Sequence, residues 1–160
     1  MLRTEAEKQG EELNRTRGKV ISNFAYLEDM ISDFIAASYF KEDEPEQLQA
    51  LKEEVLEDKF FSFEFKKQLL KKILKTRFKN VDQKFPYSQL DQLQTFRNVI
   101  AHGLLVGIGN TSSPSKIYKV SLKHGGKMYP VDETLVQYEN LRLQVQPSLD
   151  NLPGISRHRF

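Results

Sequence analysis

The chain has 160 residues, of which 39% are hydrophobic and 29% charged, as suits one globular domain large enough to bury a core. It contains no cysteine, which excludes disulfides, thiolate catalysis and zinc sites built on cysteine. Its three histidines form no His-x-x-x-His pair, so we expect no metal site and no cofactor.

The N-terminal segment gives no targeting signal. Residues 1–19 are strongly charged and have no apolar core, unlike a signal peptide. No apolar run approaches the roughly 18 residues that a membrane-spanning helix needs. We therefore expect a cytoplasmic protein without a membrane partner.

Several helices are predicted in the first half of the chain. Residues 1–16 form a charged extension, and Gly10 in it and Gly18 just after it weaken any helix there. Apolar residues at helical spacing predict a long helix over about 17–39. Pro45 opens a short acidic helix to about Leu56, since proline is tolerated in a first turn. Ser62 is positioned to cap a third helix. On the buried side of that helix we expect Phe65, Leu69, Leu70, Ile73, Leu74 and Phe78.

A fourth helix follows a proline break. Pro86 interrupts the chain, and the helix starts at Tyr87 or Ser88 and ends at His102. Gly103 occupies the position where helices favour a left-handed glycine. The apolar stripe of this helix consists of Leu90, Leu93, Phe96, Val99 and Ile100.

The next segment has strand and turn signals in place of helical spacing. Residues 104–108 form a short apolar run, and a loop follows over 109–115 by composition. Residues 117–123 alternate in polarity and can pair with 128–131 across a tight turn at Gly125-Gly126. These features predict a small β-hairpin.

The last helix completes the predicted fold. Asp132 can cap it, and we expect it to kink or end near Pro147. The fold class is then mainly all-α, an antiparallel up-down helical bundle with a small β-hairpin insertion between its last two helices. The domain spans 17–152, with the insertion at about 104–131, and 153–160 form a C-terminal tail.

Charge is distributed unevenly. Residues 42–58 carry eight acids against one lysine, whereas 66–84 carry eight Lys or Arg against one acid. Three lysines of the basic run recur every four residues and form a ridge that can follow an RNA backbone. The candidate RNA-binding residues are Lys67, Lys71, Lys72, Lys75 and Arg77. Such runs are also typical of helices that pair with each other or face solvent.

The segment from Phe96 to Gly103 places three chemically useful residues in the last turns of the fourth helix. Arg97 is a permanent cation suited to phosphate, and His102 changes charge near neutral pH. Asn98 lies four residues before His102, so the two share a helix face. Arg97 and His102 lie about 140° apart around the helix and do not converge within one chain. In the structural interpretation, both side chains satisfy carbonyls at the helix end.

The run Arg97-Asn98-Val99-Ile100-Ala101-His102-Gly103 resembles the signature of HEPN domains, an Arg followed by four to six residues and a His. Phe24-Ala25-Tyr26-Leu27-Glu28 is similar to the first-helix pattern of that family, and helix order agrees over about 17–152. The resemblance implies a metal-independent endoribonuclease of toxin or defence type. It also implies a homodimer through the helix that carries Arg97 and His102, because active members join two such motifs at the subunit interface.

The resemblance and the chemistry of these residue types give each motif residue an expected role. Arg97 would bind the scissile phosphate and stabilise its charge in the transition state. His102 would act as general acid or base, and Asn98 would orient its imidazole. Cleavage would leave a 2′,3′-cyclic phosphate. Glu28 would support the site, as a partly buried salt-bridge partner of Arg97.

The expected partners are RNA and an antitoxin or other partner protein. The alternative is a non-catalytic HEPN-like module that dimerises and binds RNA or a partner protein. Cleavage that persists in EDTA separates the two functions.

Overall fold

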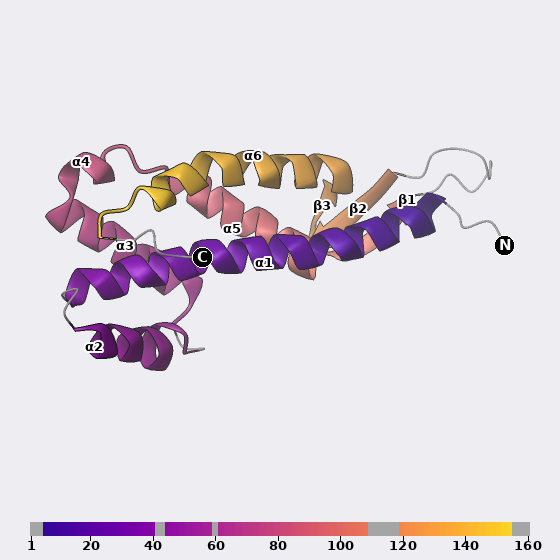
Figure 1. Ribbon diagram of the computed structural model, residues 1–160. Coiled ribbons are helices and arrows are strands. Elements are labelled where there is room, and N and C mark those ends of the chain that lie inside the picture. The colour runs from indigo at the N-terminus through magenta and orange to yellow at the C-terminus, as the bar shows by residue number, and fades with distance from the viewer. Residues whose placement is uncertain (1–4, 41–43, 59–60, 109–118, 155–160) are drawn as a thin grey trace. The chain divides into compact units, whose positions relative to one another are not determined.

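The computed structural model describes residues 5–40, 44–58, 61–108 and 119–154. The loop expected over 109–115, the first residues of the strand expected over 117–123 and the end of the tail lie outside them. The chain is mostly helical and has one small three-stranded antiparallel sheet (Figure 1).

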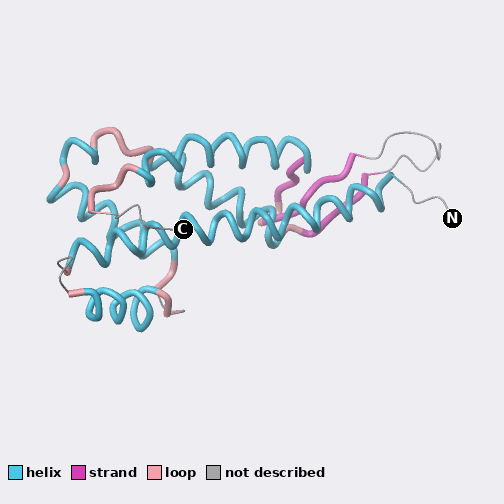
Figure 2. Tube along the Cα trace, in the orientation of Figure 1, coloured by secondary structure: helices cyan, strands magenta, loops and turns pink. Residues whose placement is uncertain are grey.

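Helices precede and follow the three strands along the chain, as Figure 2 shows. The elements in chain order are α1 Glu5–Tyr39, α2 Pro45–Ala50, the π-helical segment η1 Leu51–Leu56, α3 Phe63–Arg77, α4 Lys79–Asp82, α5 Tyr87–His102, β1 Leu104–Ile108, β2 Lys119–His124, β3 Lys127–Pro130 and α6 Val131–Asp150. They belong to two compact units. Unit 1 is Met1–Phe24 with Ser88–Leu143, and unit 2 is Ala25–Tyr87 with Gln144–Phe160.

The predicted start of the first helix at about residue 17 is wrong, because α1 is already helical at Glu5. Leu13 is fully buried, and Gly10 lies so close to β1 that a Cβ there would be 3.4 Å from the Leu105 side chain. Tertiary packing thus stabilises a segment whose own composition is marginal for a helix.

Unit 1 contains α5 from Ser88 onward, and this helix begins at Tyr87 and ends at His102 as predicted. Tyr138 is buried and donates a hydrogen bond from its hydroxyl to the carbonyl of Val20 at 3.2 Å. The apolar core of this unit contains Leu13, Val20, Phe24, Leu90, Leu93, Val99, Ile100, Val120, Leu122, Val131, Tyr138 and Leu141.

The sheet directly follows α5. Its strand order is β1-β2-β3, so the apolar run at 104–108 is the third strand that the sequence did not identify as one. β2 and β3 are joined by Gly125 and Gly126, whose φ values are +55° and +76°. Two consecutive positive φ angles are what a tight type I′ hairpin turn requires.

Unit 2 contains α2, η1, α3 and α4. Ser62 caps α3 as predicted, its hydroxyl accepting from the Phe65 amide at 3.3 Å. The expectation that Phe65 is buried is wrong, since its side chain is 42% exposed. The next residue, Lys66, is buried instead of Phe65. Its ammonium binds the Glu28 carboxylate at 2.7 Å, and this ion pair compensates the burial of the charge. The apolar residues that α3 buries are Leu70, Ile73 and Leu74.

The predicted cap of the last helix at Asp132 is wrong. α6 starts at Val131, one residue before the expected Asp132 cap, and the Thr134 hydroxyl donates to the Pro130 carbonyl at 2.6 Å. It passes through Pro147 and ends at Asp150.

Candidate functional site

Arg97, Asn98 and His102 lie in the last turns of α5, within unit 1. Arg97 and Asn98 are half-buried, whereas His102 is exposed. The helix directs Arg97 and His102 about 140° apart, so the two side chains serve different parts of the surface.

The guanidinium of Arg97 is held by two neighbours. Its Cζ atom lies 5.3 Å from the centroid of the Phe24 ring, a cation–π distance, and Phe24 is itself buried. Its Nη1 donates to Oδ1 of Asn98 at 2.9 Å. An aromatic face and an amide oxygen therefore fix the group without neutralising its charge.

Arg97 also keeps unused hydrogen-bonding capacity. Its Nε atom is buried and has no hydrogen-bond partner. No carboxylate of the described residues forms an ion pair with it. A buried donor without an acceptor is costly in a folded protein, and an anion would satisfy it.

Neither Tyr138 nor Glu139 of α6 neutralises the positive charge of Arg97. Burial raises the pKa of Tyr138 to about 12, although the positive charges of Arg142 and Arg97 act to lower it. The phenol is therefore neutral at physiological pH. Glu139 accepts two hydrogen bonds from Arg142, at 2.6 and 2.9 Å. These bonds hold the pKa of Glu139 below its ordinary value and commit its charge to Arg142.

Arg17 of α1, which the sequence did not single out, caps the carboxyl end of α5. Its Nε donates to the Ile100 carbonyl at 2.8 Å, and its Nη2 donates to the Gly103 carbonyl. It thus fills the structural role that Arg97 and His102 could have had at this helix end. Arg17 lies four residues after Leu13 and three before Val20, so the helical period placed it on the buried face.

Gly103 closes α5 for a different reason from the one expected. The positive φ angles of the described glycines are at Gly125, Gly126 and Gly154, so Gly103 is not left-handed. A Cβ on Gly103 would overlap the carbonyl oxygen of Val99 and lie 3.0 Å from Cβ of Leu122. Close approach of the backbone and the sheet therefore requires glycine here.

The expected contact between Asn98 and His102 is absent from the described residues. The Asn98 amide oxygen accepts from Arg97, and no hydrogen bond joins Asn98 to His102. Asn98 therefore orients the arginine rather than the histidine.

Glu28 forms an ion pair with Lys66, and both residues belong to unit 2. The Glu28 carboxylate binds the buried ammonium of Lys66 at 2.7 Å. This ion pair engages Glu28 in place of the expected one with Arg97, because the buried ammonium of Lys66 needs a counter-ion.

The candidate RNA-binding residues all belong to unit 2, and the first two are held by neighbours. Lys67 binds Glu64 at 2.8 Å. Lys71 lies 5.3 Å from the centroid of the Tyr87 ring. Neither ammonium is an isolated surface charge.

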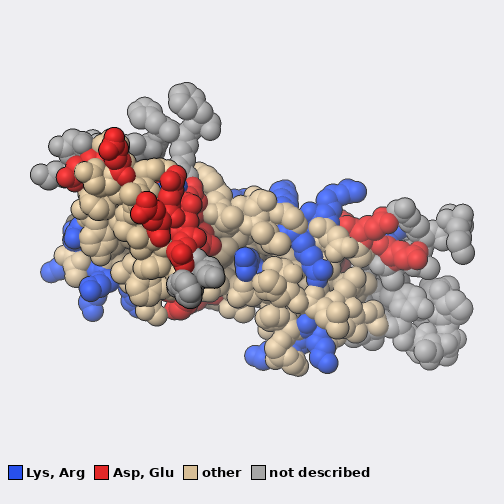
Figure 3. Space-filling model, turned by 90° about the horizontal axis from the view of Figure 1, so that it is seen from below, with Lys and Arg blue, Asp and Glu red and all other residues tan. Residues whose placement is uncertain are grey.

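The remaining three differ in availability. Arg77 donates to the Ser38 carbonyl, and its Cζ lies 5.6 Å from the Tyr39 ring centroid. Lys72 and Lys75 are exposed and have no ion pair within the described part of the chain. On the face that Figure 3 draws, acidic and basic side chains form several groups, some of which adjoin. Lys72 and Lys75 are therefore the two candidates left available to a polyanion.

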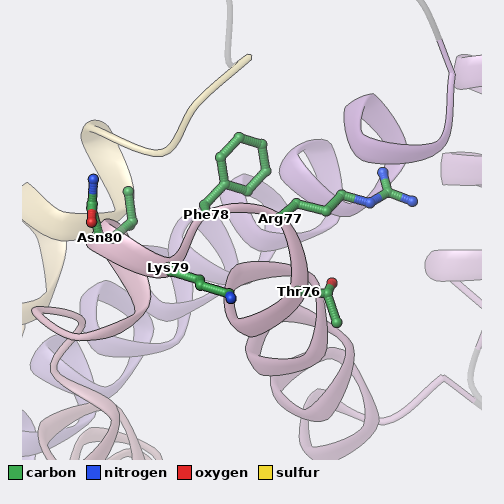
Figure 4. Close-up of a pocket in the computed structure, with 6 residues that line it drawn as sticks. Thr76, Arg77, Phe78, Lys79 and Asn80 are labelled. Carbon is green, nitrogen blue, oxygen red and sulfur yellow. The ribbon is translucent and has the colours of Figure 1, made fainter.

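A hollow of about 440 Å³ lies where α3 meets α4, lined by residues 76–81 (Figure 4). The labelled side chains fan outward from one turn rather than converge. Six consecutive residues of one turn do not form the convergent polar set typical of a ligand site.

Within the described ranges, no three His, Cys, Asp or Glu side chains gather where they could hold a metal ion. None of the helices described is long and apolar enough to cross a bilayer. No protein-family model matches the chain, and no curated protein or solved structure is significantly similar to it.

Proposed function

We propose that this chain is a HEPN-like, metal-independent endoribonuclease that acts as a homodimer. The observation that carries the proposal is Arg97, a guanidinium held by Phe24 and Asn98 whose buried Nε lacks an acceptor. A fixed, uncompensated guanidinium is suited to a phosphodiester, which accepts several hydrogen bonds and carries a full negative charge. The Arg-x4-His spacing supplies an acid–base group on the same helix.

In the proposed reaction the nucleophile comes from RNA. The ribose 2′-oxygen attacks phosphorus, the bond from phosphorus to the 5′-oxygen breaks, and a 2′,3′-cyclic phosphate and a 5′-hydroxyl result. His102 takes the 2′-hydroxyl proton or gives a proton to the leaving oxygen. Arg97 stabilises the charge that develops on the phosphoryl oxygens. Asn98 serves by holding Arg97.

The site is proposed to be shared between two copies of an antiparallel up-down bundle with a β-hairpin insertion between its last two helices. Arg97 and His102 diverge by about 140° on α5, so a two-fold axis beside this helix would bring Arg97 to the partner's His102. RNA would be the substrate, with Lys72 and Lys75 the most available of the basic candidates for its backbone. A toxin or defence role in the cytoplasm, with an antitoxin or other partner protein, belongs to the same proposal.

Cleavage of a labelled RNA in EDTA tests this function. We expect a 2′,3′-cyclic phosphate product from the wild type and none from Arg97→Ala or His102→Ala. The matched control is His124→Ala, which removes the histidine of the hairpin and leaves cleavage unchanged. Cleavage that survives in either motif variant contradicts the proposal.

A second candidate function, a non-catalytic HEPN-like module that dimerises and binds RNA or a partner protein, is favoured by one observation. No described side chain hydrogen-bonds to His102, and a catalytic imidazole usually has an orienting partner. This function predicts RNA binding that is weakened by Arg97→Ala, unchanged by His102→Ala and not followed by cleavage.

A further inference from the structure

We propose that Arg17 is a positioning residue that fixes His102 from the neighbouring helix. The inference rests on the proposed ribonuclease function, in which His102 acts on the reacting oxygens, while Arg17 binds the backbone that carries His102 and does not touch the RNA.

The two carbonyls that Arg17 binds bracket the histidine. Ile100 lies two residues before His102 and Gly103 one residue after it, and both accept hydrogen bonds from Arg17. The first of these bonds joins residues 83 positions apart in sequence. The last turn of α5 and the entry to β1 are therefore held by a side chain of α1.

The fork of the guanidinium suits this task. Its Nε and Nη2 point in the same general direction and reach two acceptors at once, which a lysine ammonium on a flexible stem does less well. The third nitrogen, Nη1, lies 3.4 Å from Oδ1 of Asn14 one turn earlier on α1. Arg17 is thus oriented by its own helix before it reaches the next one.

The backbone beside His102 is also restrained by its own helix and by β2. The Gly103 amide donates to the Val99 carbonyl at 2.8 Å, and Gly103 packs against Leu122 of β2. Because Arg17 and β2 both hold this backbone, the exposed imidazole projects from a fixed position. A general acid or base displaced by about 1 Å can lose up to ~100-fold in rate.

The kinetic test compares Arg17→Met with Arg17→Lys and with Arg15→Met, which removes an exposed arginine of the same helix. We expect Arg17→Met to lower kcat by about tenfold to ~100-fold and to leave KM within about twofold, because Arg97 is untouched. Arg17→Lys restores part of kcat, and Arg15→Met leaves it unchanged. A fall in kcat that Arg17→Lys does not relieve, or an unchanged kcat in Arg17→Met, overturns the proposal.

A spectroscopic test does not depend on activity. In the full chain labelled on histidine, the ring resonances of His102 should shift or broaden in Arg17→Met and Arg17→Lys, while those of His124 stay in place. If the wild type cleaves no RNA, the proposed function fails, and these spectra still decide the role of Arg17. Unchanged His102 resonances in either folded variant overturn the proposed role of Arg17. If Arg17→Met does not fold, Arg17→Lys alone provides the test.

Discussion

Two arginines near the end of α5 differ in what their donors satisfy. Arg17 binds two backbone carbonyls, whereas Arg97 keeps a buried Nε without an acceptor. We expect Arg17→Met to lower the free energy of unfolding by about 1–3 kcal/mol, because it leaves acceptors unpaired. Arg97→Met should change it by less than about 1 kcal/mol, since relief of the unpaired donor offsets the lost contact with Phe24.

Urea unfolding of both variants measures this difference. Equal losses in the two proteins would mean that Arg97 has a structural role like that of Arg17. A small effect on stability together with lost cleavage identifies Arg97 as a residue kept for function at some cost to the fold.

The buried phenol of Tyr138 predicts a loss of stability in alkali. Its pKa is about 12 in the folded protein against an ordinary value near 10, so the folded state keeps a proton that the unfolded state releases. The raised pKa contributes roughly 2–3 kcal/mol to the free energy of unfolding. This contribution is fully present below about pH 10 and is lost as pH rises toward about 12. The control is Tyr138→Phe, whose stability should lack this fall.

Urea unfolding from about pH 8 to about pH 12 checks the sign. Near neutrality the wild type should be more stable than Tyr138→Phe by about 0.5–1.5 kcal/mol, from the hydrogen bond to the Val20 carbonyl. That advantage should shrink and then reverse as pH rises. A constant difference across the range contradicts the raised pKa.

Local spacing was enough to select Arg97, Asn98 and His102 as candidates, because all three lie within two turns of one helix. Contacts between residues far apart in the sequence were not predictable in the same way. Arg17 meets the end of α5 across 83 residues of sequence, and Glu28 meets Lys66 across 38. Which cation is paired depends on how helices pack, and a single helical period does not contain that information.

At the scale of elements, the junction between α5 and β1 depends on a glycine. A Cβ on Gly103 would overlap the Val99 carbonyl oxygen, whereas a Cβ on Gly107 of β1 would meet nothing within 4 Å. We expect Gly103→Ala to cost about 1–3 kcal/mol and Gly107→Ala to cost less than about 0.5 kcal/mol. Thermal unfolding of the two single variants measures both changes. A Gly103→Ala protein as stable as Gly107→Ala would show that the junction can relax.

The ion pair between α1 and α3 gives a second prediction at this scale. The Lys66 side chain is 5% exposed and that of Glu28 is 30% exposed. Glu28→Gln should therefore cost about 2–4 kcal/mol, because it leaves a buried ammonium unpaired, while Lys66→Met should cost less than about 1 kcal/mol. Denaturant unfolding checks both, and a larger loss in Lys66→Met would contradict the assignment of the buried partner.

The predicted boundaries of helices agree with the structure where a cap or a proline in the local sequence sets them. Ser62 caps α3 through its own hydroxyl, and α5 starts just after Pro86. Boundaries that depend on contacts with distant parts of the chain were not predicted. α1 begins at Glu5, well before its apolar stripe, because Leu13 is buried by packing. β1 contains only five residues and is a strand because β2 pairs with it.

At the scale of the whole molecule, the proposed chemistry requires two copies of the chain. One helix cannot bring its own Arg97 and His102 to a single phosphate when they diverge by about 140°. In a two-fold dimer each site takes its arginine from one subunit and its histidine from the other. Two different inactive variants can then complement each other.

Mixing of subunits tests this arrangement. A heterodimer of Arg97→Ala and His102→Ala has one site that lacks both residues and one site that is intact. Unfolding and refolding the two variants together at equal concentration makes half of the dimers mixed, so activity should return to about a quarter of that of the wild type. Each variant refolded alone is the control and stays inactive. A mixture that also stays inactive, although the subunits exchange, would mean that both residues act from one chain, and the angle between them on α5 would then require a different geometry for the reaction.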